Sequence, residues 1–256
     1  MTFKNPMSET AQRLADRWGF IPTEELQAGW CSHVYADAAR VLKAPWRGEE
    51  QTSGYRAALA LAGWWGPEVF ESDEASGTIL IDRIIPGTTM ADKGVAEPEA
   101  RQIVVGLMKE LQGRVDPHGY PTLREYFLQP IPLLDELLET TEQVVFVHGD
   151  LHHFNVLRSD GPRPWVPIDP KALACDPAYE PIAFLRNQLD AEVPFEVTHA
   201  LIGNRLQFFA NEMGFDPARM AAWGLVDQID SGDDRNERLV EVYRSLLVGT
   251  RWSNLA

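Results

Sequence analysis

Residues 147–157 read Val-His-Gly-Asp-Leu-His-His-Phe-Asn-Val-Leu, and Ile-Asp-Pro-Lys follows at residues 168–171. The apolar, β-branched run at residues 144–147 predicts a buried strand that leads into this stretch. Two further short strands are predicted at residues 156–158 and 165–168, because Ser-Asp-Gly-Pro at 159–162 is a turn signal between them. Such a hairpin brings Asn155 and Asp169, which flank its open end, close together.

The spacing of three polar residues in this region indicates phosphoryl transfer. The order His-x-Asp-x-x-x-x-Asn, from His148 to Asn155, is the spacing of the protein-kinase catalytic loop, with Gly149 in place of its arginine. In that arrangement Asp150 accepts the proton of an acceptor hydroxyl. The oxygen donors of Asn155 and Asp169 are suited to a magnesium ion that also binds substrate phosphates. The prediction is a kinase site with Asp150 as catalytic base and Asn155 and Asp169 as metal ligands.

Two other interpretations of the same stretch were weighed. The first is a metallohydrolase loop, whose ligands would be His148, Asp150, His152 and His153. A catalytic zinc site needs about three protein ligands, but this reading gives Asn155 and Asp169 no role. The second is a polar loop with capping residues, which explains single residues and leaves their combined spacing unexplained. The kinase interpretation accounts for all of them.

The region from about residue 144 to residue 188 resembles the aminoglycoside phosphotransferase superfamily, whose loop reads His-Gly-Asp-x-His-x-x-Asn. The block from Pro167 to Glu180, followed by Phe-Leu-Arg-Asn at 184–187, is similar to its streptomycin 6-phosphotransferase and hydroxyurea-resistance kinase branch. The resemblance implies an α+β, bilobal protein-kinase-like fold. A small antiparallel-sheet lobe at residues 1–87 would bind nucleotide, and a larger, mainly helical lobe at residues 88–256 would carry the catalytic loop and the substrate cleft.

The same resemblance, looser over residues 29–90, implies a nucleotide site. Ser32 lies in a turn whose backbone N–H groups can face phosphate oxygens. Lys43, one of two lysines in the first ninety residues, would be the strand lysine that neutralises the α- and β-phosphates. The backbone of Asp82, Arg83 and Ile84 would form the hinge that bonds adenine.

Two assignments in this scheme are weaker. The chain has Gly54-Tyr55 where a helical glutamate that orients the lysine is expected, so Glu50 is the substitute. The alternative, an acidic helix start in solvent, is favoured because carboxylates prefer a helix N-terminus. Lys171, two positions after Asp169, is a candidate for steadying the transferred phosphoryl group, and a solvated lysine is the alternative.

The second lobe has helical apolar spacing in four places, near residues 103–111, 133–138, 201–209 and 237–250. Asp176 and Glu180 are expected to cap and brace the site, with Arg186 as a partner for one of them. The acidic stretch from Asp227 to Glu237 is expected to be a loop between the last helices, either solvated or in contact with a cationic ligand.

Composition limits the class of protein. The chain has 256 residues, 45% of them hydrophobic, and no apolar run of the ~18 residues needed to span a membrane. Two cysteines and the absence of a secretion signal at the start favour a cytoplasmic protein. The net charge of −15 disfavours nucleic acid as a partner and favours a small cationic substrate.

The sequence therefore predicts an ATP- and magnesium-dependent kinase that phosphorylates a hydroxyl of a streptomycin-like aminoglycoside or a related small cation and confers antibiotic resistance. Two alternatives stay open. One is a housekeeping kinase for an amino sugar, an amino alcohol or hydroxyurea, and the other is a nucleotide-binding protein without activity. Neither the acceptor nor the oligomeric state can be deduced from the sequence.

Overall fold

The computed structural model describes residues 4–26, 31–46, 48–189, 193–232 and 237–255. The chain divides into two compact units, and the first contains Met1–Met90 together with Asn155–Lys171. The second contains Ala91–Phe154 and Ala172–Ala256. The sequence predicted a single division at residue 87, whereas the observed contacts group the segment from Asn155 to Lys171 with the N-terminal unit.

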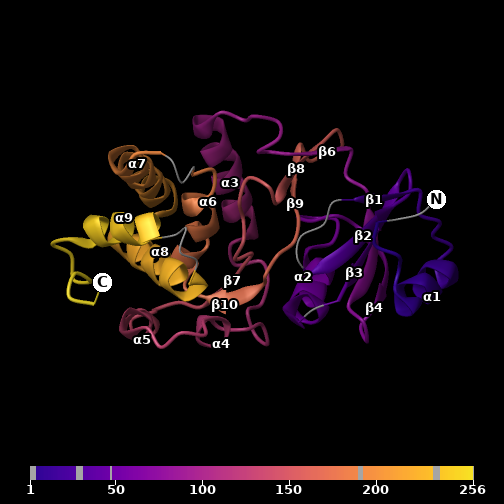
Figure 1. Ribbon diagram of the computed structural model, residues 1–256, viewed down its shortest axis with the longest axis horizontal. Coiled ribbons are helices and arrows are strands. Elements are labelled where there is room, and N and C mark those ends of the chain that lie inside the picture. The colour runs from indigo at the N-terminus through magenta and orange to yellow at the C-terminus, as the bar shows by residue number, and fades with distance from the viewer. Residues whose placement is uncertain (1–3, 27–30, 47, 190–192, 233–236, 256) are drawn as a thin grey trace. The chain divides into compact units, whose positions relative to one another are not determined.

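The first unit is built on a five-stranded antiparallel sheet in the order β1-β2-β3-β5-β4 (Figure 1). Each strand pairs with its neighbour in antiparallel register, so that Lys43 on β3 lies opposite Val34 on β2 and Ile79 on β5. The strands span Glu24–Leu26, Ser32–Ala36, Arg40–Pro45, Val69–Asp73 and Thr78–Asp82, numbered β1 to β5.

Two helices accompany this sheet. Helix α1, Glu9–Arg17, begins at Ser8, whose side chain accepts a hydrogen bond from the Ala11 N–H, and it packs Ala11 and Ala15 against Tyr35 and Leu42 of the sheet. Helix α2, Ser53–Leu61, follows the short 3-10 helix η1, Gly48–Gln51. A helical segment in two pieces therefore follows Lys43.

The predicted hairpin is also present in the first unit. Strand β8, Val156–Ser159, pairs with β9, Trp165–Pro167, and β6, Pro86–Thr89, completes a three-stranded sheet in the order β6-β8-β9. The Ile168 N–H donates to the Asn155 carbonyl at 2.9 Å, which continues the pairing beyond the strand ends. The pairing brings the backbones of Asn155 and Ile168 together, so the hairpin predicted from the Asp-Gly turn signal is confirmed.

The second unit is mainly helical, with one short two-stranded sheet of β7, Val145–Val147, and β10, Leu173–Cys175. The four apolar periodicities in the sequence correspond to α3, α5, α7 and α9. Helices α4 and α8 have no counterpart in the prediction, whereas η2 and α6 lie where Asp176 and Glu180 were expected to cap a helix. In chain order the helices span Glu97–Leu111 (α3), Leu123–Tyr126 (α4), Pro132–Glu139 (α5), Pro177–Tyr179 (η2), Ile182–Arg186 (α6), Phe195–Met213 (α7), Pro217–Ser231 (α8) and Glu237–Leu247 (α9).

Helix α8 corrects the expectation that the acidic stretch after Asp227 is a loop. Asp227 and Asp230 are helical, and residues 233–236 of that stretch lie outside the described residues. The N-cap aspartate at 216, the proline at 217 and Gly232 with φ +57° at the C-cap are start and stop signals that could have located this helix. None of the helices in the described ranges is long and apolar enough to cross a membrane.

Candidate active site

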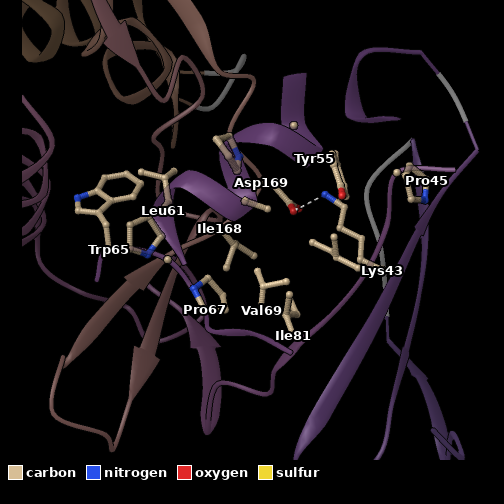
Figure 2. A pocket seen from close by; sticks show the side chains of 17 residues that line it. Lys43, Pro45, Tyr55, Leu61, Trp65, Pro67, Val69, Ile81, Ile168 and Asp169 are labelled. Carbon is tan, nitrogen blue, oxygen red and sulfur yellow. Dashed lines mark hydrogen bonds and ion pairs between the residues drawn. The ribbon is translucent and has the colours of Figure 1, made fainter. Parts of the chain in front are cut away.

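In the first unit the strand lysine and the predicted metal ligand form an ion pair. The Lys43 Nζ lies 2.6 Å from the Asp169 Oδ1, with the lysine side chain largely buried and the aspartate side chain 41% exposed (Figure 2). Lys43 is on the central strand β3, and Asp169 follows the hairpin strand β9. Two residues that are 126 positions apart in the sequence therefore meet in one ion pair.

Asp169 has an unusual backbone conformation, because its φ is +58°, in the left-handed region. A residue other than glycine adopts this region rarely and at some cost in energy, and such residues concentrate at functional sites. The hairpin on one side and the bond to Lys43 on the other hold the residue there. The conformation directs a carboxylate at the lysine immediately after the buried residues of β9.

A mainly apolar pocket of about 60 Å³ lies beside this ion pair in the first unit. Figure 2 shows Leu61 and Trp65 on one side of it and Val69 and Ile81 on the other, with Lys43 and Asp169 labelled at its polar end. Gly54 also lines it, at the position where a helical glutamate was expected. Gly54 therefore offers no carboxylate to Lys43, which is paired with Asp169.

The remaining nucleotide-site predictions have mixed outcomes. Ser32 is buried at the start of β2, but residues 27–30 of its turn are outside the described part of the chain. The Glu50 backbone is in η1, and its side chain is likewise outside the described part. The N–H groups of Asp82 and Arg83 already donate to the Glu68 and Ala39 carbonyls. Those two N–H groups are therefore already hydrogen-bonded to backbone carbonyls of the first unit.

Lys171 ends the segment of the first unit that follows the hairpin. Its carbonyl oxygen accepts a hydrogen bond at 3.3 Å from the hydroxyl of Ser53, the first residue of α2. This bond ties the segment after Asp169 to helix α2. The proposed role of the Lys171 ammonium in phosphoryl transfer stays a prediction.

In the second unit the catalytic loop is anchored by a buried carboxylate. The Glu180 Oε2 accepts a hydrogen bond from the His148 N–H at 2.6 Å, and its Oε1 accepts one from the Gly149 N–H at 3.3 Å. Glu180 is 5% exposed. The loop is also bonded to itself, because the Asp150 N–H donates to the His148 Nδ1 at 3.2 Å. The predicted bracing role of Glu180 is therefore correct.

Burial makes the Glu180 carboxyl a weaker acid than an ordinary glutamate. Desolvation raises the pKa of Glu180 to about 8, and the two backbone donors, which favour the charged form, reduce the shift without cancelling it. Both oxygens of the carboxyl retain lone pairs whether or not it is protonated. Glu180 can therefore accept the hydrogen bonds of the two loop N–H groups in either state.

Asp150 is paired with a cation that the sequence did not predict. The Arg186 Nη2 lies 3.5 Å from the Asp150 Oδ1, and the Arg186 Nε lies 3.0 Å from the Asp227 Oδ2. Arg186 was expected to pair with Asp176 or Glu180. Asp176 instead caps η2 through the Ala178 N–H and pairs with Arg219.

The histidines of the loop have structural partners. The His153 Nδ1 lies 3.0 Å from the Asn187 Oδ1, and the ring stacks on Phe184. Desolvation lowers the pKa of His153 to about 4, which keeps it neutral. Among the described residues there is no group of three or more His, Cys, Asp or Glu side chains arranged to hold a metal. The metallohydrolase alternative therefore has no support in this part of the chain.

The chain has a protein-kinase-like fold. The streptomycin–ATP ternary complex of APH(2")-IIa has the same fold, with a TM-score of 0.58 and 18% identity over 95% of this chain and 99% of that one. The α+β class predicted from the sequence is thereby confirmed.

Residues 123–237 match the family model described as aminoglycoside/hydroxyurea antibiotic resistance kinase. The chain is 26% identical to a streptomycin 6-kinase of Streptomyces glaucescens over 83% of its own length and 77% of the relative. It is 29% identical to a hydroxyurea phosphotransferase of Kitasatospora aureofaciens, over 82% and 67% of the two chains. The chain is therefore similar to the aminoglycoside phosphotransferase superfamily, in the branch of these kinases, and the predicted resemblance is confirmed.

Proposed function

We propose that this protein transfers the γ-phosphate of ATP to a hydroxyl of a streptomycin-like aminoglycoside in the cytoplasm and so confers resistance. The observation that carries the proposal is the Lys43–Asp169 ion pair, at 2.6 Å. Asp169 was selected by the catalytic pattern, and Lys43 was selected by the family resemblance. The kinship with streptomycin 6-kinases supports the choice of acceptor.

The proposed mechanism assigns one task to each residue. Asp150 orients the acceptor hydroxyl and takes its proton as the oxygen attacks the γ-phosphate in line. Lys43 neutralises phosphate charge beside the apolar pocket of the first unit. Because the protein supplies little covalent chemistry, positioning and charge neutralisation account for most of the rate enhancement.

The donors present also fit a magnesium ion. Asn155 and Asp169 are hard oxygen donors at the open end of one hairpin, and the absence of a larger ligand cluster among the described residues agrees with an ion that retains water and phosphate ligands. When bound, magnesium would offset the negative charge of the substrate phosphates. Asn155 and Asp169 would hold it, while Lys43 keeps the Asp169 carboxylate oriented.

The charge of the protein supports a cationic acceptor. The sequence carries 38 acidic and 23 basic residues, and an excess of negative charge raises the local concentration of positive ligands. Hydroxyurea is a second candidate, because one relative is a hydroxyurea phosphotransferase at 29% identity. An amino sugar or amino alcohol is a third class to include in a test, since acceptor preference diverges faster than fold.

The deciding experiment measures magnesium-dependent ADP release from ATP with streptomycin, other aminoglycosides, hydroxyurea, amino sugars and choline-like alcohols. The Asp150→Asn variant is assayed in parallel. We expect streptomycin to stimulate release, and we expect the variant to lose about 10²–10⁴ in turnover, as is usual when a general base is removed. Nucleotide binding by the variant, followed by ATP titration, should be retained.

Other outcomes redirect the proposal. Stimulation by hydroxyurea alone, lost in Asp150→Asn, would reassign the acceptor and leave the site intact. ATP binding without stimulation by any acceptor would favour a nucleotide-binding protein without activity. Turnover of Asp150→Asn near the wild-type value would show that the proposed base is wrong.

A further inference from the structure

The catalytic aspartate is held by an arginine that is itself held by a second carboxylate. Arg186 is the last residue of α6, and its guanidinium contacts Asp150 of the catalytic loop and Asp227 of α8 at 3.5 Å and 3.0 Å. These three residues belong to three segments of the second unit that are far apart in the sequence. The contact therefore depends on the fold of the whole unit.

Asp227 is well placed to fix the arginine. Its side chain is 12% exposed, its Oδ1 accepts a hydrogen bond from the Tyr179 hydroxyl at 3.2 Å, and its Oδ2 accepts one from the Gln228 amide at 2.7 Å. Tyr179 is 2% exposed, so this anchor is embedded in the core. The pair with Arg186 is electrostatic, because no acceptor in the described residues is aligned with the Arg186 Nε–H.

The arginine in this group keeps its charge. Burial lowers the pKa of Arg186, but the carboxylates of Asp227 and Asp150 outweigh it and raise the pKa above its usual value. The charged guanidinium contacts both carboxylates and lies closer to Asp227 than to Asp150.

The contact also restricts the orientation of Asp150. Arg186 and His152 both approach the same oxygen of Asp150, the Oδ1, at 3.5 Å and 3.7 Å. Two contacts to one oxygen restrict the rotation of the Asp150 side chain. A base in a defined orientation needs less reorganisation to meet an acceptor hydroxyl, and a displacement of about 1 Å at such a group can cost a factor of about 10² in rate.

We propose that Arg186 is a positioning residue for phosphoryl transfer, which orients the Asp150 carboxylate, and that Asp227 acts by holding Arg186. This inference rests on the proposed function for its catalytic meaning. It predicts that Arg186 and Asp227 affect the rate constant of transfer and leave the affinity for ATP unchanged.

The test compares the kcat and KM of Arg186→Ala, Arg186→Lys, Asp227→Asn and the double variant Arg186→Ala/Asp227→Asn. We expect Arg186→Ala to lower kcat by about 10² with the KM for ATP within about twofold, and Arg186→Lys, which keeps the charge, to recover part of the loss. Asp227→Asn should lower kcat by less, and the double variant should be no slower than Arg186→Ala, because both changes act through one contact.

Chemical rescue distinguishes positioning from a structural role. Guanidinium chloride at millimolar concentration should restore part of the activity of Arg186→Ala, whereas ammonium chloride at equal ionic strength should restore less. Arg219→Ala is the matched control, because Arg219 is a largely buried arginine whose partners are Asp176, Thr140, Thr141 and Leu137 rather than the catalytic loop. Its expected defect is a lowered Tm without rescue.

Several results would overturn the inference. The inference is wrong if Arg186→Ala has the kcat of the wild type. It is also wrong if Arg186→Ala loses kcat only in proportion to its lowered Tm and to the same extent as Arg219→Ala. If Asp227→Asn strongly raises the KM for the acceptor, and its effect adds fully to that of Arg186→Ala in the double variant, then Asp227 contacts the acceptor instead. If the wild-type protein turns over no acceptor, the proposed function is wrong, and the inference is then tested by structure alone. Crystal structures of wild type and Arg186→Ala decide it. An unchanged orientation of the Asp150 carboxylate in Arg186→Ala refutes the inference, and a changed orientation supports it.

Discussion

The Lys43 ammonium lies 2.6 Å from the carboxylate of Asp169, so the strand lysine is paired directly with a predicted metal ligand. Gly54 lines the adjoining pocket where a helical glutamate was expected. The partner of Lys43 is therefore the residue that we propose as a magnesium ligand. In the proposed mechanism, this pair of side chains joins phosphate neutralisation and metal binding.

The first prediction concerns Lys43→Met. Methionine keeps much of the apolar stem and removes the charge, so the contact with the nucleotide phosphates is lost. A hydrogen bond to a charged group is worth about 1.5–3 kcal/mol, which corresponds to roughly a 10- to 100-fold rise in the Kd for ATP. Isothermal titration with ATP and magnesium measures it. The control is Lys109→Met, because Lys109 forms a solvent-exposed ion pair with Glu212, and equal losses for both would contradict the assignment.

The second prediction concerns Asp169→Asn. An amide is a weaker ligand for a hard cation than a carboxylate, so the magnesium concentration that gives half-maximal ADP release should rise by about tenfold or more. A magnesium titration at fixed ATP measures the change. Asp160→Asn, an exposed position at the turn of the same hairpin, is the control. An unchanged magnesium requirement in Asp169→Asn would exclude Asp169 as a ligand.

The third prediction concerns Gly77, whose φ is +69°. A Cβ at this position would lie 2.6 Å from the Gln51 Cα, so Gly77→Ala introduces both backbone strain and a clash with the backbone of η1. We expect the free energy of unfolding to fall by more than the about 1–2 kcal/mol that a left-handed alanine costs alone.

Gly19→Ala separates the two contributions to the Gly77 effect. Gly19 has φ +59° and no atom within 4 Å of the added Cβ, so the variant carries strain without a clash. Urea unfolding of both variants measures the difference. If both variants lose the same free energy of unfolding, η1 moves to accommodate the methyl group of Gly77→Ala without a measurable cost.

The sequence was informative where the determinants are local. The turn signal and β-branched runs at residues 156–168 predicted the hairpin that brings the segment of Asp169 next to Asn155. Apolar spacing near 103–111 predicted α3, because a helix buries residues three and four apart. In both cases the deciding interactions lie within about a dozen residues of one another in the chain.

Long-range pairings could not be predicted in this way. Arg186 and Asp227 are 41 positions apart, and nothing near either residue distinguishes this pairing from one with Asp176 or Glu180. Helix α8 was missed because apolar residues occupy most of its central turns, so it lacks the one-sided pattern of a surface helix. The selection of ion-pair partners depends on how helices pack, which a single sequence does not state.

The last prediction concerns Glu180, whose burial raises its pKa to about 8 from an ordinary value of 4.5. Between these two values the folded protein holds a proton that the unfolded chain has released. The Glu180 contribution to the free energy of unfolding is therefore full below pH 4.5, falls as the pH rises towards 8, and is lost above it. Glu180→Gln does not titrate, so its stability relative to wild type should rise steadily over this range.

Urea unfolding of wild type and Glu180→Gln from pH 5 to pH 9 measures this difference, and subtraction removes titrations common to both, including that of His153. Glu142→Gln, an exposed position in the same unit, should give a flat difference. The glutamine retains one acceptor oxygen for the two N–H groups of His148 and Gly149 and presents its amide to the other, so kcat should also fall. The expectation is wrong if the difference in free energy of unfolding between wild type and Glu180→Gln does not change with pH. In that case the pKa of Glu180 is ordinary, and the two backbone hydrogen bonds to its carboxylate offset the full cost of burying it.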